Sequence, residues 1–198
     1  SLGNVVSVQD ILKRGYRASA LRYVLLSTHY RKQLRFTWDS LAQAEESLHR
    51  LMDCLARVNA VTMVANHPEV TERVSEAQVA FAEKLMDDLN TPGALGVIFK
   101  LVRDLNAAID AGELGREDVP VVRAAFEQFD QVLGVISLRR SEEAIPPIAV
   151  DEIDKLIEAR HVARRKRDFS AADKVRDALD VQGIVLEDTP NGTRWKRK

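Results

Sequence analysis

Apolar residues recur at alternating intervals of three and four along the middle of the chain, and this spacing most limits the possible folds. In the stretch 37–65 they are Leu41, Ala44, Leu48, Leu51, Leu55 and Val58. Such spacing places all six on one face of an α-helix. Comparable patterns occupy residues 70–87, 91–112 and 118–136. Helices of this kind need each other to bury their apolar faces, so we predict an antiparallel helix bundle over residues 37–138.

Two short helices are predicted before the bundle. Ser7 is a hydroxyl cap with Asp10 three residues further on, which predicts a helix to about Arg14. The apolar pattern indicates a second helix over about 17–28. The residues from 30 to 37 then form a basic loop.

Capping and turn residues set the expected ends of the long helices. Thr37 can cap the first of them, and Thr91 can cap the third, which has Pro92 at its first position. Asp87-Asp88 falls where the second helix stops and the third begins. Paired carboxylates can perform acid–base or metal chemistry, but capping and turn formation is the default interpretation here.

A smaller unit follows a predicted linker at 137–149, which contains Pro146-Pro147. Asp151 opens a helix to about 167, and Ser170 caps another that stops at Gly183. A strand at 184–186, the turn signal Pro190-Asn191-Gly192 and a return strand at 193–195 predict a hairpin. The expected fold is mainly α: an antiparallel helix bundle followed by a small α+β domain of two helices and a short β-hairpin.

Composition excludes several classes of protein. The chain of 198 residues has 45% hydrophobic and 30% charged residues, which are globular proportions. Its single cysteine, Cys54, excludes a disulfide framework and a zinc site built from several cysteines, and it fits a small apolar position on its helix. No apolar run approaches the roughly 18 residues of a membrane span. We therefore expect a cytoplasmic protein with no membrane partner.

The residues show no self-sufficient active site. The four histidines, His29, His49, His67 and His161, are scattered and have no metal-binding spacing. Neither a phosphate-binding glycine loop nor a nucleophile elbow is present. We expect no metal and no catalytic residue in this chain.

Charge is distributed unevenly, although the net charge is only −1. Residues 1–38 carry a net +6, residues 39–138 a net −9 and residues 139–198 a net +2. The basic residues placed to reach phosphates near helix ends and in the loop are Arg14, Arg17, Arg31, Lys32 and Arg35. Such residues give affinity for a nucleic-acid backbone without reading its sequence. The alternative is that all these charges lie on solvated faces.

A second group of residues in the tail suits base recognition. Arg164 belongs to a basic helix end, and Phe169 follows at a junction where an aromatic ring can be exposed. Asp173 and Arg176 are three residues apart and share a helix face. The pair could form an intrahelical salt bridge, or it could read the edges of bases while Phe169 stacks on one. Trp195 is expected to pack on the last helix.

Several segments, in this order, resemble the cysteinyl-tRNA synthetase family. They are Ser1-Leu2-Gly3-Asn4, Ser19-Ala20-Leu21-Arg22-Tyr23, His29-Tyr30-Arg31, Phe36-Thr37-Trp38, Asp87-Asp88-Leu89-Asn90-Thr91-Pro92, Lys166-Arg167-Asp168-Phe169-Ser170-Ala171-Ala172-Asp173, Gly183-Ile184-Val185-Leu186-Glu187-Asp188 and Gly192-Thr193-Arg194-Trp195. Ser1 resembles the last residue of the KMSKS signature of class I synthetases. The chain thus resembles the C-terminal portion of such an enzyme.

The resemblance implies a different role for each part of the chain. It suggests a stem-contact region at 1–36, the helix bundle at 37–138 and an anticodon-binding domain at 149–198. The implied anticodon-reading set is Arg164, Phe169, Asp173, Arg176 and Asp188. Family members often have Trp at the position of Phe169. The partners implied are tRNA-Cys and the N-terminal catalytic domain, and the ATP and zinc sites of the intact enzyme would lie outside this chain.

Two alternatives stay open at this point. The chain could be a synthetase-derived helical module that binds another protein through its acidic bundle. It could also be an enzyme in its own right, which the missing nucleotide loop and metal set disfavour.

Overall fold

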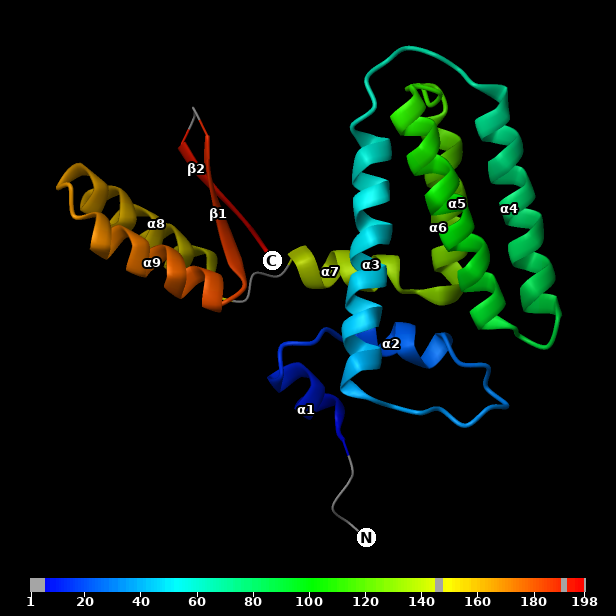
Figure 1. The fold of residues 1–198 in the computed structure, drawn as a ribbon, viewed down its shortest axis with the longest axis horizontal. Coiled ribbons are helices and arrows are strands. Elements are labelled where there is room, and N and C mark those ends of the chain that lie inside the picture. Colours follow the sequence, from blue (N-terminus) through cyan, green and yellow to red (C-terminus); the bar gives the residue numbers. More distant parts are fainter. Residues whose placement is uncertain (1–5, 145–147, 190–191, 198) are drawn as a thin grey trace, which may run out of the picture. The chain divides into compact units, whose positions relative to one another are not determined.

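The four long segments with apolar spacing form helices in the computed structural model, which describes residues 6–144, 148–189 and 192–197. They are α3 (Trp38–Asn59), α4 (Pro68–Met86), α5 (Thr91–Ala111) and α6 (Val119–Leu133). Figure 1 shows them side by side, with α3 against α5 and α4 against α5 and α6. The predicted stripe from Leu41 to Val58 is buried in their common core. The helix bundle is therefore confirmed.

Two short helices precede the bundle, as predicted. In α1 (Val8–Lys13), Ser7 and Asp10 form a reciprocal capping box. α2 (Ala18–Leu26) packs on α3 and contributes Ala20 and Val24 to the core. Arg22 of α2 donates a hydrogen bond to the carbonyl oxygen of Leu133, so α2 also holds the end of α6.

Several predicted helix ends were wrong, because backbone conformation selects the cap. Thr37 does cap α3, but Asn90 rather than Thr91 caps α5 by accepting from the Gly93 amide at 2.9 Å. Thr91 instead donates its hydroxyl to the Leu26 carbonyl oxygen, 2.7 Å away. In the tail, Asp168 rather than Ser170 caps its helix, by accepting from the amide of Ala171.

The helix α3 ends at Asn59, before the predicted end at 65, because the following loop forms tertiary hydrogen bonds. The amide of Arg116 donates to the Met63 carbonyl oxygen at 2.7 Å, and the amide of Glu117 donates to that of Ala65 at 3.3 Å. These bonds join the loop after α3 to the loop after α5. The contact is so close that a Cβ on Gly115 would lie 1.9 Å from the Ala65 oxygen.

The predicted linker at 137–149 contains a helix, α7 (Ile136–Ala144). Gly134 ends α6 in a left-handed conformation, so Ile136 belongs to α7 and not to the preceding apolar stripe. The Asp130 carboxylate accepts hydrogen bonds from the Ile136 and Ser137 amides, which fixes the start of α7. Arg139 is buried and forms an ion pair with Glu45 of α3. This part of the segment is therefore integral to the bundle.

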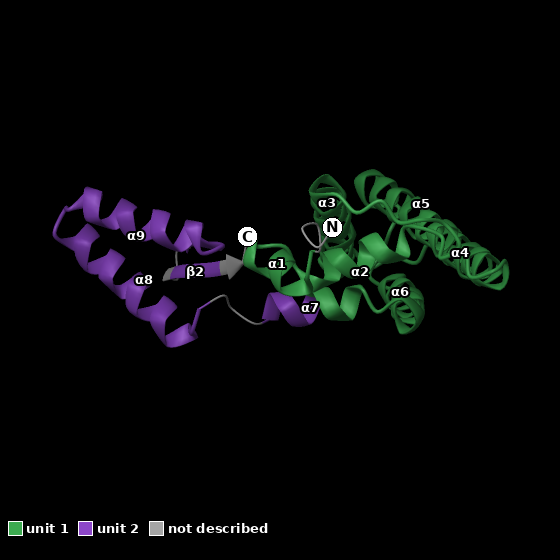
Figure 2. Cartoon of the chain, turned by 90° about the horizontal axis from the view of Figure 1, so that it is seen from below, with its two compact units in different colours: residues 1–139 green, residues 140–198 purple. Residues whose placement is uncertain are grey.

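The chain divides into two units, residues 1–139 and 140–198, coloured separately in Figure 2. The second contains α8 (Val150–Arg165), α9 (Phe169–Val181) and an antiparallel hairpin of β1 (Ile184–Thr189) and β2 (Gly192–Arg197). Leu186 pairs with Trp195 across the hairpin, and both pack on a small core of Ile153, Leu179 and Ile184. The predicted α+β arrangement is confirmed.

Three predicted features lie wholly or partly outside the described residues. They are the segment Ser1-Leu2-Gly3-Asn4, the pair Pro146-Pro147, and Pro190-Asn191 of the predicted turn signal. Among the residues that are described, no helix is both long enough and apolar enough to span a membrane.

Candidate nucleic-acid interface

The basic residues predicted to contact phosphates differ in how firmly the protein already holds them. The guanidinium of Arg14 lies over the Trp38 ring, 3.9 Å from its centroid. Arg17 is mostly buried; its amide donates to Glu45 and its side chain lies 3.8 Å from the same carboxylate. Lys32 and Arg35 are exposed in the loop before α3. Arg17 is therefore the least available of the predicted set.

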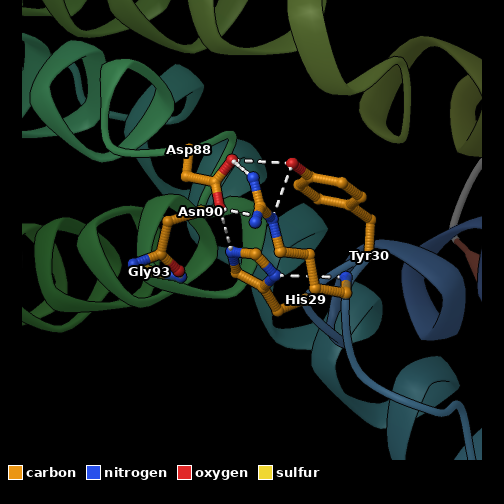
Figure 3. Close-up of polar contacts among 6 residues, drawn as sticks. His29, Tyr30, Asp88, Asn90 and Gly93 are labelled. Atoms are coloured by element: carbon orange, nitrogen blue, oxygen red, sulfur yellow. Dashed lines mark hydrogen bonds and ion pairs between the residues drawn. The ribbon is translucent and has the colours of Figure 1, made fainter.

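Arg31 takes part in a polar cluster that the sequence did not predict (Figure 3). Its Nε lies 2.8 Å from Asp88 Oδ2, and its Nη2 donates to Asp88 Oδ1 at 3.0 Å. The Tyr30 hydroxyl donates to the same Oδ1 at 2.6 Å and accepts from Arg31 Nε at 3.0 Å. The His29 ring stacks on Tyr30 and lies 3.9 Å from the Asp88 carboxylate. This carboxylate thus connects the basic loop to the turn between α4 and α5.

The turn that carries Asp88 has an uncommon backbone. Asp88 and Leu89 both have positive φ, +53° and +51°, a left-handed region that side chains other than glycine rarely adopt. Asp tolerates it better than most residues. The predicted turn role of Asp87-Asp88 is confirmed, and Asp88 adds an ion pair that the turn by itself does not require.

In the second unit, α8 and α9 meet at a tip rich in basic residues. Arg167 has a φ of +60° and reverses the chain direction, and Asp168 then caps α9. Phe169, the first residue of α9, is 62% exposed. The exposed aromatic ring expected from the sequence is present, and it closely follows Arg164, Arg165 and Lys166 at the end of α8 along the chain.

Asp188 is held by three side chains of its own unit. Its two oxygens accept from Arg160 at 2.9 and 2.8 Å, from Arg164 at 2.9 Å and from the Thr193 hydroxyl at 2.7 Å. These hydrogen bonds, chiefly that from Arg160, hold the pKa of the Asp188 carboxyl well below its ordinary value. Asp188 therefore fixes the orientation of Arg164, and its part in base reading remains a prediction.

Asp173 and Arg176 lie exposed on α9. Within the described part of the chain no ion pair joins them, so the intrahelical salt bridge considered from the sequence does not form. Both side chains are available to a ligand. Their proposed reading of bases stays a prediction.

Sequence reasoning missed the long-range contacts of the two residues that organise these surfaces, Asp88 and Arg160. Arg160 is buried and contacts Asp188, 28 residues away along the chain. Asp88 contacts residues 57 and 58 positions earlier. Neither pairing has a local signal, because helix periodicity reports only contacts three or four residues apart.

The described residues do not fit a zinc site. They contain no group of three or more histidine, cysteine or acidic side chains placed to hold a metal ion. Cys54 is buried, and burial raises the pKa of its thiol to about 11, which disfavours the thiolate that binds metals.

Comparisons with known proteins find three family models that match successive parts of this chain. A family model described as the cysteinyl-tRNA ligase anticodon binding domain matches residues 148–195, and the DALR domain model matches residues 80–138. The model of the class I (C) tRNA synthetase catalytic domain matches residues 1–46, which include the predicted stem-contact region.

Curated relatives match over the whole chain. Cysteine–tRNA ligases of Protochlamydia amoebophila, Solibacter usitatus and Geobacter sulfurreducens are 34%, 38% and 36% identical to it, and all three alignments cover 100% of this chain. The chain spans 41%, 42% and 44% of those relatives, so it corresponds to less than half of their length. Three family models in series and relatives of one kind show that this chain belongs to the cysteinyl-tRNA synthetase family.

Proposed function

We propose that this chain is a tRNA-binding part of a cysteine–tRNA ligase. Residues 149–198 read the anticodon of tRNA-Cys, and basic residues within 1–36 contact the backbone of its stem. The whole enzyme would then attach cysteine to this tRNA in an ATP-dependent reaction, in the cytoplasm. The ATP and zinc of the whole enzyme would be bound outside this chain.

The observation that carries the proposal is the exposed Phe169 at the basic tip of α8 and α9. Phe169 is 62% exposed and is not among the residues that pack on the core of its own unit, so its ring is accessible for stacking on an unpaired base. Asp173, whose carboxylate can accept from a base amino group, and Arg176, which can donate to base acceptors, lie on the same helix. Stacking and edge recognition are the two components of single-stranded RNA reading.

The test is direct binding of the 198-residue chain to tRNA-Cys transcripts, with the natural anticodon and with single anticodon changes, over a salt titration. We expect each change to weaken binding by about 1–3 kcal/mol, roughly 5- to 150-fold. Equal, steeply salt-dependent binding of all transcripts would leave only the backbone contacts. Binding to no tRNA would reject the proposal and favour a protein-interaction module.

A pair of matched variants locates the reading surface. Asp173→Ala should lower discrimination between the anticodons, because it removes the proposed acceptor. Asp154→Ala removes the same charge from an exposed position near the start of α8, away from the tip. Discrimination should therefore be unchanged in Asp154→Ala.

A further inference from the structure

The loop between α2 and α3 contains three exposed basic residues, Arg31, Lys32 and Arg35, and is held in two different ways. Leu34 and Phe36, in its second half, pack against the hydrophobic core. The first half is fixed by polar contacts: Tyr30 and Arg31 both bind the Asp88 carboxylate, which comes from the turn between α4 and α5 (Figure 3).

These contacts restrain the Arg31 side chain but leave part of it accessible. Asp88 and Tyr30 bind Nε and Nη2, and within the described residues Nη1 forms no hydrogen bond or ion pair. The side chain of Arg31 is 67% exposed. A guanidinium restrained at one edge can still donate to a phosphate from the other, and phosphate is the group that its planar fork suits best.

The contacts of Asp88 with Tyr30 and Arg31 are poorly explained by a contribution to fold stability. Exposed ion pairs contribute little to stability, and the Asp88 side chain is 44% exposed. The turn also places two residues other than glycine in the left-handed region, which costs free energy. A strained, exposed carboxylate that restrains an accessible arginine is better explained by ligand binding than by folding.

We infer that Asp88 is a positioning residue for tRNA: its carboxylate holds Tyr30 and Arg31 so that the basic loop presents the Arg31 guanidinium to a backbone phosphate. This inference rests on the proposed tRNA binding and adds a residue to it. An arginine side chain that is ordered before binding loses less conformational entropy when it binds. The negative charge of Asp88 opposes phosphate binding, because a phosphate bound to Arg31 would lie within a Debye length of it, so the gain from ordering Arg31 must exceed this repulsion.

The test compares Asp88→Asn with Asp87→Asn in tRNA-Cys binding by the full chain. Asn also tolerates the left-handed backbone, so the turn is kept. Asp87 is the neighbouring exposed acid, and within the described residues its side chain makes no contact with the loop. We expect Asp88→Asn to bind roughly 2- to 10-fold more weakly and to lower the salt slope by about one. Asp87→Asn should bind no more weakly than the wild type.

A double-mutant cycle with Arg31→Ala distinguishes positioning from a general effect on the fold. In that background, Asp88→Asn should change binding no further, because nothing remains to be positioned. Should Asp88→Asn fail to fold, Tyr30→Phe takes its place: it removes the hydroxyl that bridges Asp88 and Arg31 but keeps their direct contacts, so a smaller weakening is expected, and it should disappear in the Arg31→Ala background.

The other possible results contradict either the inference alone or the proposed function together with it. Unchanged or tighter binding by Asp88→Asn would overturn the inference and leave the proposed function intact. An undiminished loss in the Arg31→Ala background would do the same. Absence of tRNA binding by the wild-type chain would reject the proposed function, and the inference with it.

Discussion

Phe169 is the residue whose environment most clearly separates function from folding. Replacing this 62% exposed ring with alanine should leave the stability of the second unit nearly unchanged. The same change should weaken tRNA-Cys binding by about 1–3 kcal/mol, the usual contribution of a base–aromatic stack. Phe169→Trp should bind at least as tightly, because stacking area increases. The matched control is Val181→Ala, an exposed apolar residue at the other end of α9, whose tRNA affinity should equal that of the wild type.

Asp188, in contrast, contributes to folding, because its carboxylate accepts hydrogen bonds from side chains of its own unit. Its pKa is lowered by the hydrogen bonds from Arg160, Thr193 and Arg164, so ionised Asp188 stabilises the second unit at pH above its unfolded pKa of about 4. That stabilisation is lost as pH falls through the lowered folded pKa. Asp188→Asn should therefore destabilise the second unit at neutral pH by about 1–2 kcal/mol, a modest value because the carboxylate is half exposed.

The pH dependence separates this effect from loss of packing. Urea unfolding at pH 7 and pH 3, followed by Trp195 fluorescence in a Trp38→Phe background, should show a smaller stability difference between the two proteins at pH 3, because that pH lies below the unfolded pKa of Asp188 and above its lowered folded pKa. An equal loss of unfolding free energy in Asp188→Asn at both pH values would show that the charge of Asp188 is not what stabilises the hairpin against α8.

Two glycines of the bundle, Gly115 in the joined loops and Gly96 inside α5, give predictions of opposite sign. Gly115→Ala would place a Cβ 1.9 Å from the Ala65 oxygen, so the loops must separate, at a cost of about 1–3 kcal/mol. Gly96, exposed inside α5, has nothing within 4 Å of its would-be Cβ. Gly96→Ala should stabilise the bundle by about 0.5–1 kcal/mol through helix propensity. Urea midpoints of the two variants should lie on either side of the wild-type value.

The same elements show what a sequence can and cannot predict. The α3 stripe from Leu41 to Val58 was predictable, because helix periodicity alone selects its buried face. The residue that caps a helix was less predictable. Asn90 and Thr91 are both good caps, and the backbone conformation of the turn decides between them. The Asp88 and Arg160 contacts were not predictable, since each joins residues distant in sequence. The candidate surfaces were thus recognised by composition, while the residues that orient them needed the structure.

At the scale of the whole molecule, two separate cores serve two proposed tasks. The first unit has one extensive core that includes parts of α1 to α7. The second buries only Ile153, Ala172, Leu179 and Ile184 among its described apolar residues. A smaller unit buries a smaller fraction of its surface and is less stable for that reason. The unit proposed to read the anticodon should therefore be the more easily unfolded of the two.

The two tryptophans of the chain can test this difference, because one lies in each unit. Trp38 begins α3 and Trp195 lies in β2. With Trp195→Phe and Trp38→Phe as reciprocal single-tryptophan variants, urea should unfold the environment of Trp195 at a lower concentration than that of Trp38. Saturating tRNA-Cys should raise the Trp195 midpoint, since a ligand that binds only the folded state stabilises it. Coincident midpoints without tRNA would instead show that the two cores unfold as one cooperative system, and the anticodon unit would then derive its stability from the bundle.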